Sequence, residues 1–160
     1  MASGKTTVGR QLAARLGWEF LDSDEQVEAR TGRTVAQIWR DEGEGGFRRL
    51  EREALEEALA STAVRPAVVA AAGGTVLDPA NREVLRRHPP VVWLRARPAT
   101  SALRAGTGDS RPLLGADPLG ALVRLYAERR PFYEEVAGAV VDVDDIPPDE
   151  VVARVLEAVG

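Results

Sequence analysis

Cysteine is absent from this 160-residue sequence, and histidine occurs only once. A disulfide framework and a thiolate zinc site are therefore excluded, and a single histidine cannot build a histidine metal cluster. Long apolar runs are lacking too. None approaches the length of a membrane span, and no charged-then-apolar signal segment precedes the first helical pattern. We therefore expect a cytoplasmic protein with no membrane partner.

An excess of basic residues is also missing, because 21 Lys and Arg stand against 25 Asp and Glu, for a net charge of -4. Acidic and basic residues alternate along the helical segments instead of forming a basic stripe. Proteins that bind the nucleic-acid backbone usually show such a stripe. We expect no nucleic-acid partner, and we expect the chain to act as a monomer.

The remaining composition is that of an ordinary globular protein, with 44% hydrophobic and 29% charged residues. A chain of this length buries roughly two thirds of the surface that it exposes when unfolded, without disulfides or metals. Neither an internal repeat nor a linker divides the sequence. We therefore expect one domain over residues 1–160, built around a single core.

Helical and strand patterns alternate along the chain. The apolar run at 67–72 does not alternate with polar residues, which is typical of a parallel strand buried on both faces. The order predicts an α/β fold with a mainly parallel sheet, helices on both faces and right-handed crossovers. We expect strands at 18–21, 67–72, 91–94 and 139–143, and helices at 7–16, 25–31, 46–61, 79–87, 99–104, 119–133 and 148–159, with a further helix start at the N-cap Thr34.

Between these elements, residues 105–117 have turn residues and no periodicity, which indicates a mobile surface segment. Four apolar residues are assigned to the core and one polar residue to a surface loop. The core residues are Trp18, Val68, Trp93 and Leu94, and the loop residue is His88.

The first candidate site is Gly4-Lys5-Thr6, the second half of a phosphate-binding loop G-x-x-x-x-G-K-[ST]. The glycine allows the backbone to approach a phosphate, the lysine supplies a positive charge, and the threonine hydroxyl can bind Mg²⁺. The following helix adds the N–H groups of its first turn. The first glycine of the motif would lie two positions before Met1, so a chance GKT at a helix start remains an alternative.

Two carboxylates, Asp22 and Asp24, follow the expected strand at 18–21. In doubly wound sheets, ligands bind outside the carboxyl ends of the strands. Carboxylates there can hold Mg²⁺ through water or accept a proton from an attacking hydroxyl. The alternative is that they are solvated or cap a helix.

A third group could bind an acidic substrate. Arg48 and Glu51 are three residues apart, so they can pair on one helical face. The pair would hold the Arg48 guanidinium in place for a carboxylate ligand. An exposed ion pair is the commoner meaning of this spacing. Gly73 and Gly74 follow an apolar strand, where a substrate could press against bare backbone or the chain could simply turn. Three further arginines, which could neutralise phosphate charge or simply be solvated, are Arg104, Arg111 and Arg129.

Read together, these stretches resemble shikimate kinase over nearly the whole chain. The supporting segments are GKTTVGRQLAARLGWEFLDSD, RTGRTVAQIWRDEGEGGFRRLE, AAGGTV, RPLL and ERRPFYEEVA. The family phosphorylates the 3-hydroxyl of shikimate from ATP, in aromatic amino-acid biosynthesis. The resemblance implies a P-loop kinase fold with a five-stranded parallel sheet, substrate-binding helices at about 25–61 and a mobile lid at about 105–117.

The resemblance also implies roles for individual residues. Lys5, Asp24 and Arg111 would be catalytic, with Asp24 as the base, and Thr6 and Asp22 would hold Mg²⁺. The nucleotide would contact Gly4, Lys5, Thr6, Thr7, Arg104, Arg111 and Pro112. Shikimate would contact Asp24, Arg48, Gly73, Gly74 and Arg129, near the apolar residues Trp39 and Phe47.

The sequence departs from the family pattern in three places. Ala72 and Ala2 stand where the family usually has glycine, and the methyl group of Ala72 is expected to narrow the substrate pocket. The first strand, central in the family sheet, is not in the sequence. We expect that the chain begins too late, for instance through a misplaced start codon, and that loss of this strand is severely destabilising.

Two other functions stay open from the sequence. Gluconate kinases share the loop, helix and GW-x-F-x-D-x-D opening, but FRRLE with RPLL favours shikimate. A truncated, non-catalytic P-loop protein is the second alternative. The joint presence of five chemically competent side chains argues against it, namely Lys5, Asp24, Arg48, Arg111 and Arg129.

Overall fold

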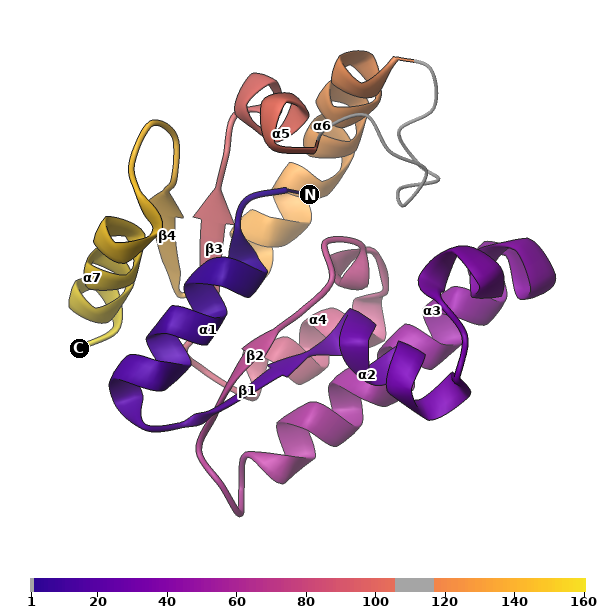
Figure 1. Ribbon diagram of the computed structural model, residues 1–160, viewed down its shortest axis with the longest axis horizontal. Coiled ribbons are helices and arrows are strands. Elements are labelled where there is room, and N and C mark those ends of the chain that lie inside the picture. The colour runs from indigo at the N-terminus through magenta and orange to yellow at the C-terminus, as the bar shows by residue number, and fades with distance from the viewer. Residues whose placement is uncertain (1, 106–116) are drawn as a thin grey trace. The chain divides into compact units, whose positions relative to one another are not determined.

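The structure is a computed structural model and describes residues 2–105 and 117–160 (Figure 1). Helices and strands alternate along the chain, as the sequence predicts. In chain order the elements are α1 (Lys5–Leu16), β1 (Glu19–Asp22), α2 (Ser23–Thr31), α3 (Val35–Ser61), β2 (Ala67–Ala70), the 3-10 helix η1 (Thr75–Leu77), α4 (Pro79–Arg86), β3 (Val92–Arg95), α5 (Pro98–Ala105), α6 (Pro118–Val136), β4 (Ala139–Asp142) and α7 (Pro148–Val159).

The predicted parallel pairing of strands is confirmed. β1 pairs with β2 and β3 pairs with β4, each in parallel and over four residues. The described residues thus supply four of the five strands that the resemblance implies, in two separate two-stranded sheets. The architecture is α/β.

The chain divides into two compact units, Gly9–Thr75 and Met1–Val8 with Val76–Gly160. One boundary falls within α1 and the other follows Thr75. A single domain over 1–160 remains a prediction. Among the described residues, no helix is both long and apolar enough to cross a membrane.

In the unit Gly9–Thr75, α2 and α3 pack together beside the β1–β2 pair (Figure 1). Thr34 caps α3 as predicted, because its hydroxyl accepts a hydrogen bond from Gln37 N while the Gln37 side chain accepts one from Thr34 N. The chain bends at Gly43, whose φ of 70° is left-handed, so α3 joins two helical segments across a kink. The core of this unit comprises Val27, Ile38, Phe47 and Ala54, with Val35, Trp39 and Leu50 packed against them.

In the other unit, α7 packs on β4, and α6 contacts both α4 and α5. Trp93 of β3 is buried and stacks on Tyr133 of α6, with ring centroids 5.3 Å apart. Asp78 caps α4 as predicted, since its carboxylate accepts a hydrogen bond from Ala80 N. These contacts hold the β3–β4 pair between helices of its own unit.

One core assignment is wrong, because Trp18 is 46% exposed. Trp18 N donates to Ala13 O and Gly17 N donates to Ala14 O, so Trp18 completes the helix-ending motif of α1 instead of starting the strand. The core assignment of Trp93 and the exposed position of His88 are confirmed, while Val68 and Leu94 are only partly buried.

Candidate active site

The phosphate loop leads directly into α1. Gly4 has a φ of 88°, and Val8 N donates to Gly4 O, so the helix begins at Lys5, two residues earlier than predicted. Lys5, Thr6 and Thr7 therefore lie in the first turn. The N–H groups of a first helical turn have no partner within the helix and point toward any anion at that end.

Ala2 has a φ of 53°, a left-handed conformation that glycine adopts without strain and alanine does not. The backbone here thus explains why the sequence departure at this position matters. An alanine in this conformation costs roughly 1 kcal/mol relative to glycine.

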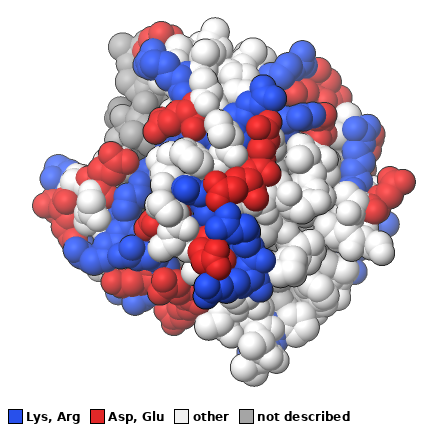
Figure 2. Space-filling view, turned by 180° about the vertical axis from the view of Figure 1, so that it is seen from behind, with Lys and Arg blue, Asp and Glu red and all other residues white. Residues whose placement is uncertain are grey.

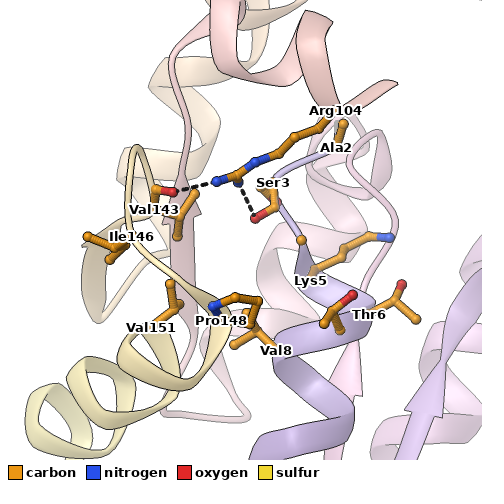
Figure 3. Close-up of a pocket in the computed structure, with 12 residues that line it drawn as sticks. Ala2, Ser3, Lys5, Thr6, Val8, Arg104, Val143, Ile146, Pro148 and Val151 are labelled. Atoms are coloured by element: carbon orange, nitrogen blue, oxygen red, sulfur yellow. Dashed lines mark hydrogen bonds between the residues drawn. The ribbon is translucent and has the colours of Figure 1, made fainter. Parts of the chain in front are cut away.

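A pocket of ≈ 480 Å³ opens at this end of α1, within the unit formed by residues 1–8 and 76–160. Figure 3 shows Lys5 and Thr6 on one side of it and apolar side chains on the other. The lining residues are Ala2, Ser3, Gly4, Lys5, Thr6, Thr7, Val8, Arg104, Val143, Ile146, Pro148 and Val151. One side is thus suited to phosphates and the other to a flat apolar ring.

Arg104 of α5 lies across the pocket (Figure 3). Its guanidinium donates from Nη2 to Val143 O at 2.8 Å and from Nη1 to Ser3 O at 3.4 Å. Arg104 therefore lines the same pocket as Lys5, and its contact with a nucleotide remains a prediction. The arginine joins the loop before α1 to the residue after β4.

The apolar side of the pocket is what the sequence reasoning missed. Val143, Ile146, Pro148 and Val151 follow β4 and open α7. A signal for them exists, because a turn-rich segment after a parallel strand lies at the sheet edge where ligands bind. Sequence alone does not pair this segment with a loop about 140 positions earlier.

In the unit Gly9–Thr75, Asp22 is buried and caps α2, since its Oδ1 accepts a hydrogen bond from Asp24 N at 3.1 Å. Asp22 thus caps a helix, which is one of the alternatives that the sequence predicts. Asp24 is partly buried in the first turn of α2. Ser23, which the sequence reasoning did not single out, is fully buried, and its Oγ accepts a hydrogen bond from Ala72 N at 3.0 Å. This bond joins the ends of β1 and β2.

Arg48 pairs with Glu51 as the spacing predicts. Nη1 of Arg48 lies 3.1 Å and 2.9 Å from the two carboxylate oxygens, and Glu51 is 1% exposed, so the interpretation as an exposed ion pair is wrong. Nη2 of Arg48 pairs at 3.3 Å with Glu44, which is exposed. The guanidinium also lies over the rings of Trp39 and Phe47.

The absence of a side chain at Gly74 leaves room for the Arg48 guanidinium. A Cβ added at Gly74 would lie within 2.6 Å of Arg48 Cζ and Nη2, and nearer still to Nη1. The bare backbone therefore lies against an arginine, in a turn as one alternative predicted, and contact with a substrate remains a prediction. Gly73 precedes it in the same turn.

Arg129 lies in α6, in the unit that holds the phosphate loop, and is 3% exposed. Its Nε has no hydrogen-bond partner among the residues that the structure describes. A buried guanidinium N–H without a partner is costly, and an anionic ligand would satisfy it. Arg111, Pro112 and most of the expected lid lie outside the described residues.

The two residues expected to hold a metal offer oxygen atoms, the Thr6 hydroxyl and the Asp22 carboxylate. Oxygen is the ligand type that Mg²⁺ prefers, and Mg²⁺ sites often use one or two protein ligands with water and phosphate. Within the described ranges, no three His, Cys, Asp or Glu side chains gather as a metal site. The donor set thus fits a nucleotide-bound Mg²⁺.

The whole chain matches a known family. The family model described as shikimate kinase covers residues 1–160. The shikimate kinase of Symbiobacterium thermophilum is 51% identical over 98% of this chain and 90% of its own length. The shikimate kinase of Moorella thermoacetica is 47% identical over 99% of this chain and 89% of its own.

Solved structures agree. A shikimate kinase from Acinetobacter baumannii in complex with shikimate has a TM-score of 0.92 at 37% identity, covering 98% of this chain and 87% of that one. The shikimate kinase from Aquifex aeolicus has a TM-score of 0.84 at 32% identity, covering 99% and 90%. These matches favour neither a gluconate kinase nor a non-catalytic P-loop remnant. The chain belongs to the shikimate kinase family.

Proposed function

We propose that this chain transfers the γ-phosphoryl group of ATP to the 3-hydroxyl of shikimate, giving shikimate 3-phosphate and ADP, in aromatic amino-acid biosynthesis. The observation that carries the proposal is the pocket at the start of α1, where a lysine, a helix N-terminus and an apolar wall meet. Membership of the shikimate kinase family supplies the acceptor.

The nucleotide is bound by residues of the phosphate-loop pocket. The left-handed Gly4 and the first-turn N–H groups of Lys5, Thr6 and Thr7 approach the phosphates, and the Lys5 ammonium neutralises their charge. The apolar wall after β4 takes the base, with the Arg104 guanidinium beside it. Contacts from Arg111 and Pro112 remain predictions from the resemblance.

Shikimate is bound through its carboxylate by cationic side chains. Arg48 is held by Glu51 and the backbone at Gly74, so the ligand carboxylate replaces only the exposed Glu44 at Nη2. Arg129 is the second cation, and its buried Nε supports that role. Gly73 is proposed to line the same region.

Asp24 acts as the general base. As the 3-hydroxyl oxygen forms a bond to the γ-phosphorus, the bond from phosphorus to the ADP oxygen breaks and the hydroxyl proton passes to the Asp24 carboxylate. Lys5 stabilises the charge on the phosphoryl oxygens, and Arg111 is proposed to do the same. Positioning and charge neutralisation supply most of the catalysis.

We further propose Mg²⁺ as the divalent cation, held by the Thr6 hydroxyl and, through water, by Asp22. When bound, the ion neutralises phosphate charge. Asp22 also caps α2, so one side chain would serve both the fold and the ion.

Shikimate and ATP are the proposed ligands, with no nucleic-acid or membrane partner, and a monomeric, cytoplasmic protein remains our prediction. Figure 2 shows Lys and Arg side chains interspersed with Asp and Glu on the face that it displays. Many acidic and basic side chains of the described residues form ion pairs, such as Arg30 with Glu53 and Glu57. Paired charges of this kind leave little excess charge for a polyanion.

A coupled assay of ADP release, with and without shikimate, tests the proposal. We expect ADP release to depend on shikimate, and gluconate to be inert at the same concentration. The 160-residue chain is assayed beside a form carrying any residues that its genomic sequence encodes directly upstream. Turnover of gluconate or of a nucleotide, with shikimate ignored, would make the proposed substrate wrong.

A further inference from the structure

We propose that Asp144 is a positioning residue for the nucleotide pocket. From the loop after β4, its carboxylate caps α5 and thereby fixes Val143 and Arg104 in the pocket wall. The inference rests on the proposed function only in taking the ligand of this pocket to be ATP. All the residues involved belong to the unit formed by residues 1–8 and 76–160.

The N-terminus of α5 has no cap of its own. Ser101 N donates to Arg97 O, which makes Arg97 the N-cap residue, and an arginine side chain has no oxygen to accept from the first turn. Pro98 then opens the helix and brings no N–H. The cap must therefore come from elsewhere in the chain.

Asp144, 47 residues along the chain, accepts from the backbone N–H of this N-cap residue, one of the donors that a helix start leaves unpaired. Its Oδ1 and Oδ2 accept from Arg97 N at 3.0 Å and 3.2 Å, and the hydroxyl of Thr100 also donates to the carboxylate. Arg97 Nε lies 3.3 Å from Oδ2, and the Asp144 side chain is 16% exposed. Asp145, next in the chain, pairs with the Arg97 side chain and is 83% exposed.

The negative charge of Asp144 also favours its position at the start of α5. Burial alone would raise the pKa of Asp144, but the hydrogen bonds from Thr100 and from the backbone of Arg97, with the Arg97 charge, lower the pKa below its ordinary value. The carboxylate is thus ionised at neutral pH. A negative charge is favourable at the N-terminus of a helix.

This cap lies one residue from the pocket. Val143 is buried and lines the pocket, and its carbonyl accepts from Arg104 in the last turn of α5. The loop is thus joined to α5 at both ends of the helix, through Asp144 at the start and Val143 at the finish. Ile146, two residues beyond Asp144, lines the same wall. Loss of the Asp144 contact leaves Val143 held by Arg104 and by the bond from Val143 N to Arg95 O.

The test compares Asp144→Ala with Asp145→Gly, its neighbour on the same arginine, by direct titration with ADP and by KM for each substrate. Glycine is chosen for the control because Asp145 has a left-handed φ of 60°, which glycine adopts without strain. We expect Asp144→Ala to raise the ADP Kd and the KM for ATP about tenfold, while Asp145→Gly stays within about twofold of the unmodified chain. The KM for shikimate stays unchanged. Asp144→Asn keeps an acceptor for Arg97 N and recovers most of the affinity.

An ADP Kd of Asp144→Ala equal to that of the unmodified chain overturns the inference, as does an equal loss of affinity in Asp145→Gly. A proportional rise in both KM values also overturns it, because that indicates general loss of structure. If Asp144→Ala does not fold, Thr100→Val removes one donor to the same carboxylate and should weaken ADP binding about threefold, and unchanged binding then counts against the cap. An unmodified chain that binds ADP but ignores shikimate refutes the proposed function and leaves this test intact.

Discussion

At the residue scale, Arg48 shows how an arginine can be prepared for a ligand. Glu51 holds one end of its guanidinium, two aromatic rings lie beside it, and Gly74 leaves room behind it. Fixing the group before binding lowers the entropy cost of binding a carboxylate. Its position therefore depends on each of these neighbours.

Gly74→Ala should therefore weaken binding of the acid substrate through its effect on Arg48. The new Cβ would overlap the Arg48 guanidinium and displace it. We expect the KM for shikimate to rise about tenfold, with the KM for ATP unchanged. Gly45→Ala is the matched control, since Gly45 is an exposed helical position in α3 where a Cβ meets nothing within 4 Å. Equal KM values in both variants would contradict the proposed clamp.

Asp24→Asn should stop phosphoryl transfer while ADP still binds. The amide keeps the shape of the side chain but cannot accept the proton, so we expect kcat to fall about 10²-fold or more. Steady-state turnover and an ADP titration measure the two effects. Asp41→Asn, on the exposed face of α3, is the control. Turnover that survives in Asp24→Asn would remove Asp24 from the role of base.

At the element scale, α3 carries Arg48 on the segment that follows its kink. The capping box at Thr34 fixes where α3 begins, and the left-handed Gly43 changes its direction before Arg48. The position of Arg48 thus depends on the start and on the kink of the element. Both devices are local in sequence.

Thr34→Ala should lower the free energy of unfolding by about 1 kcal/mol, because Gln37 N loses its acceptor. Chemical denaturation followed by circular dichroism measures the change. Thr34→Ser retains the hydroxyl and should lose much less. A variant with alanine that is as stable as the one with serine would show that the cap contributes nothing to α3.

At the scale of the whole molecule, the predicted ligand contacts are divided between the two units. Lys5, Arg104 and Arg129 belong to one unit, and Asp24 and Arg48 belong to the other. Because Arg129 is a predicted shikimate contact, the unit that holds the phosphate loop is expected to contribute to binding of both ligands. Lys5 is suited to follow the nucleotide, because it is the only lysine of the sequence.

An amine-reactive reagent should modify Lys5, which is only partly buried, and ATP should protect it. At a nucleotide concentration about ten times Kd, labelling should slow about tenfold, because the phosphates cover the ammonium. Peptide mapping separates Lys5 from the N-terminal amine. Shikimate alone serves as the control and should protect little. Labelling of Lys5 that ATP leaves unchanged would contradict its place at the phosphates.

Local sequence signals predicted most of the elements. The bounds of α7 and the caps at Thr34 and Asp78 follow from residues within one helical turn of each other. Helix starts were the weaker part, since α1 begins at Lys5 and not at residue 7. The helix start depends on the conformation of Gly4, which a sequence pattern does not report.

The sequence by itself determined the α/β order, the half phosphate loop and the Arg48–Glu51 pair, because each rests on spacings of a few residues. Only the tertiary structure decided that Glu51 is buried, that Gly74 makes room for a guanidinium, and that Asp144 caps a helix 47 residues away. The reason is physical. Propensity and periodicity act within a turn or a strand, whereas burial and the partners of a side chain depend on which distant segments pack against it.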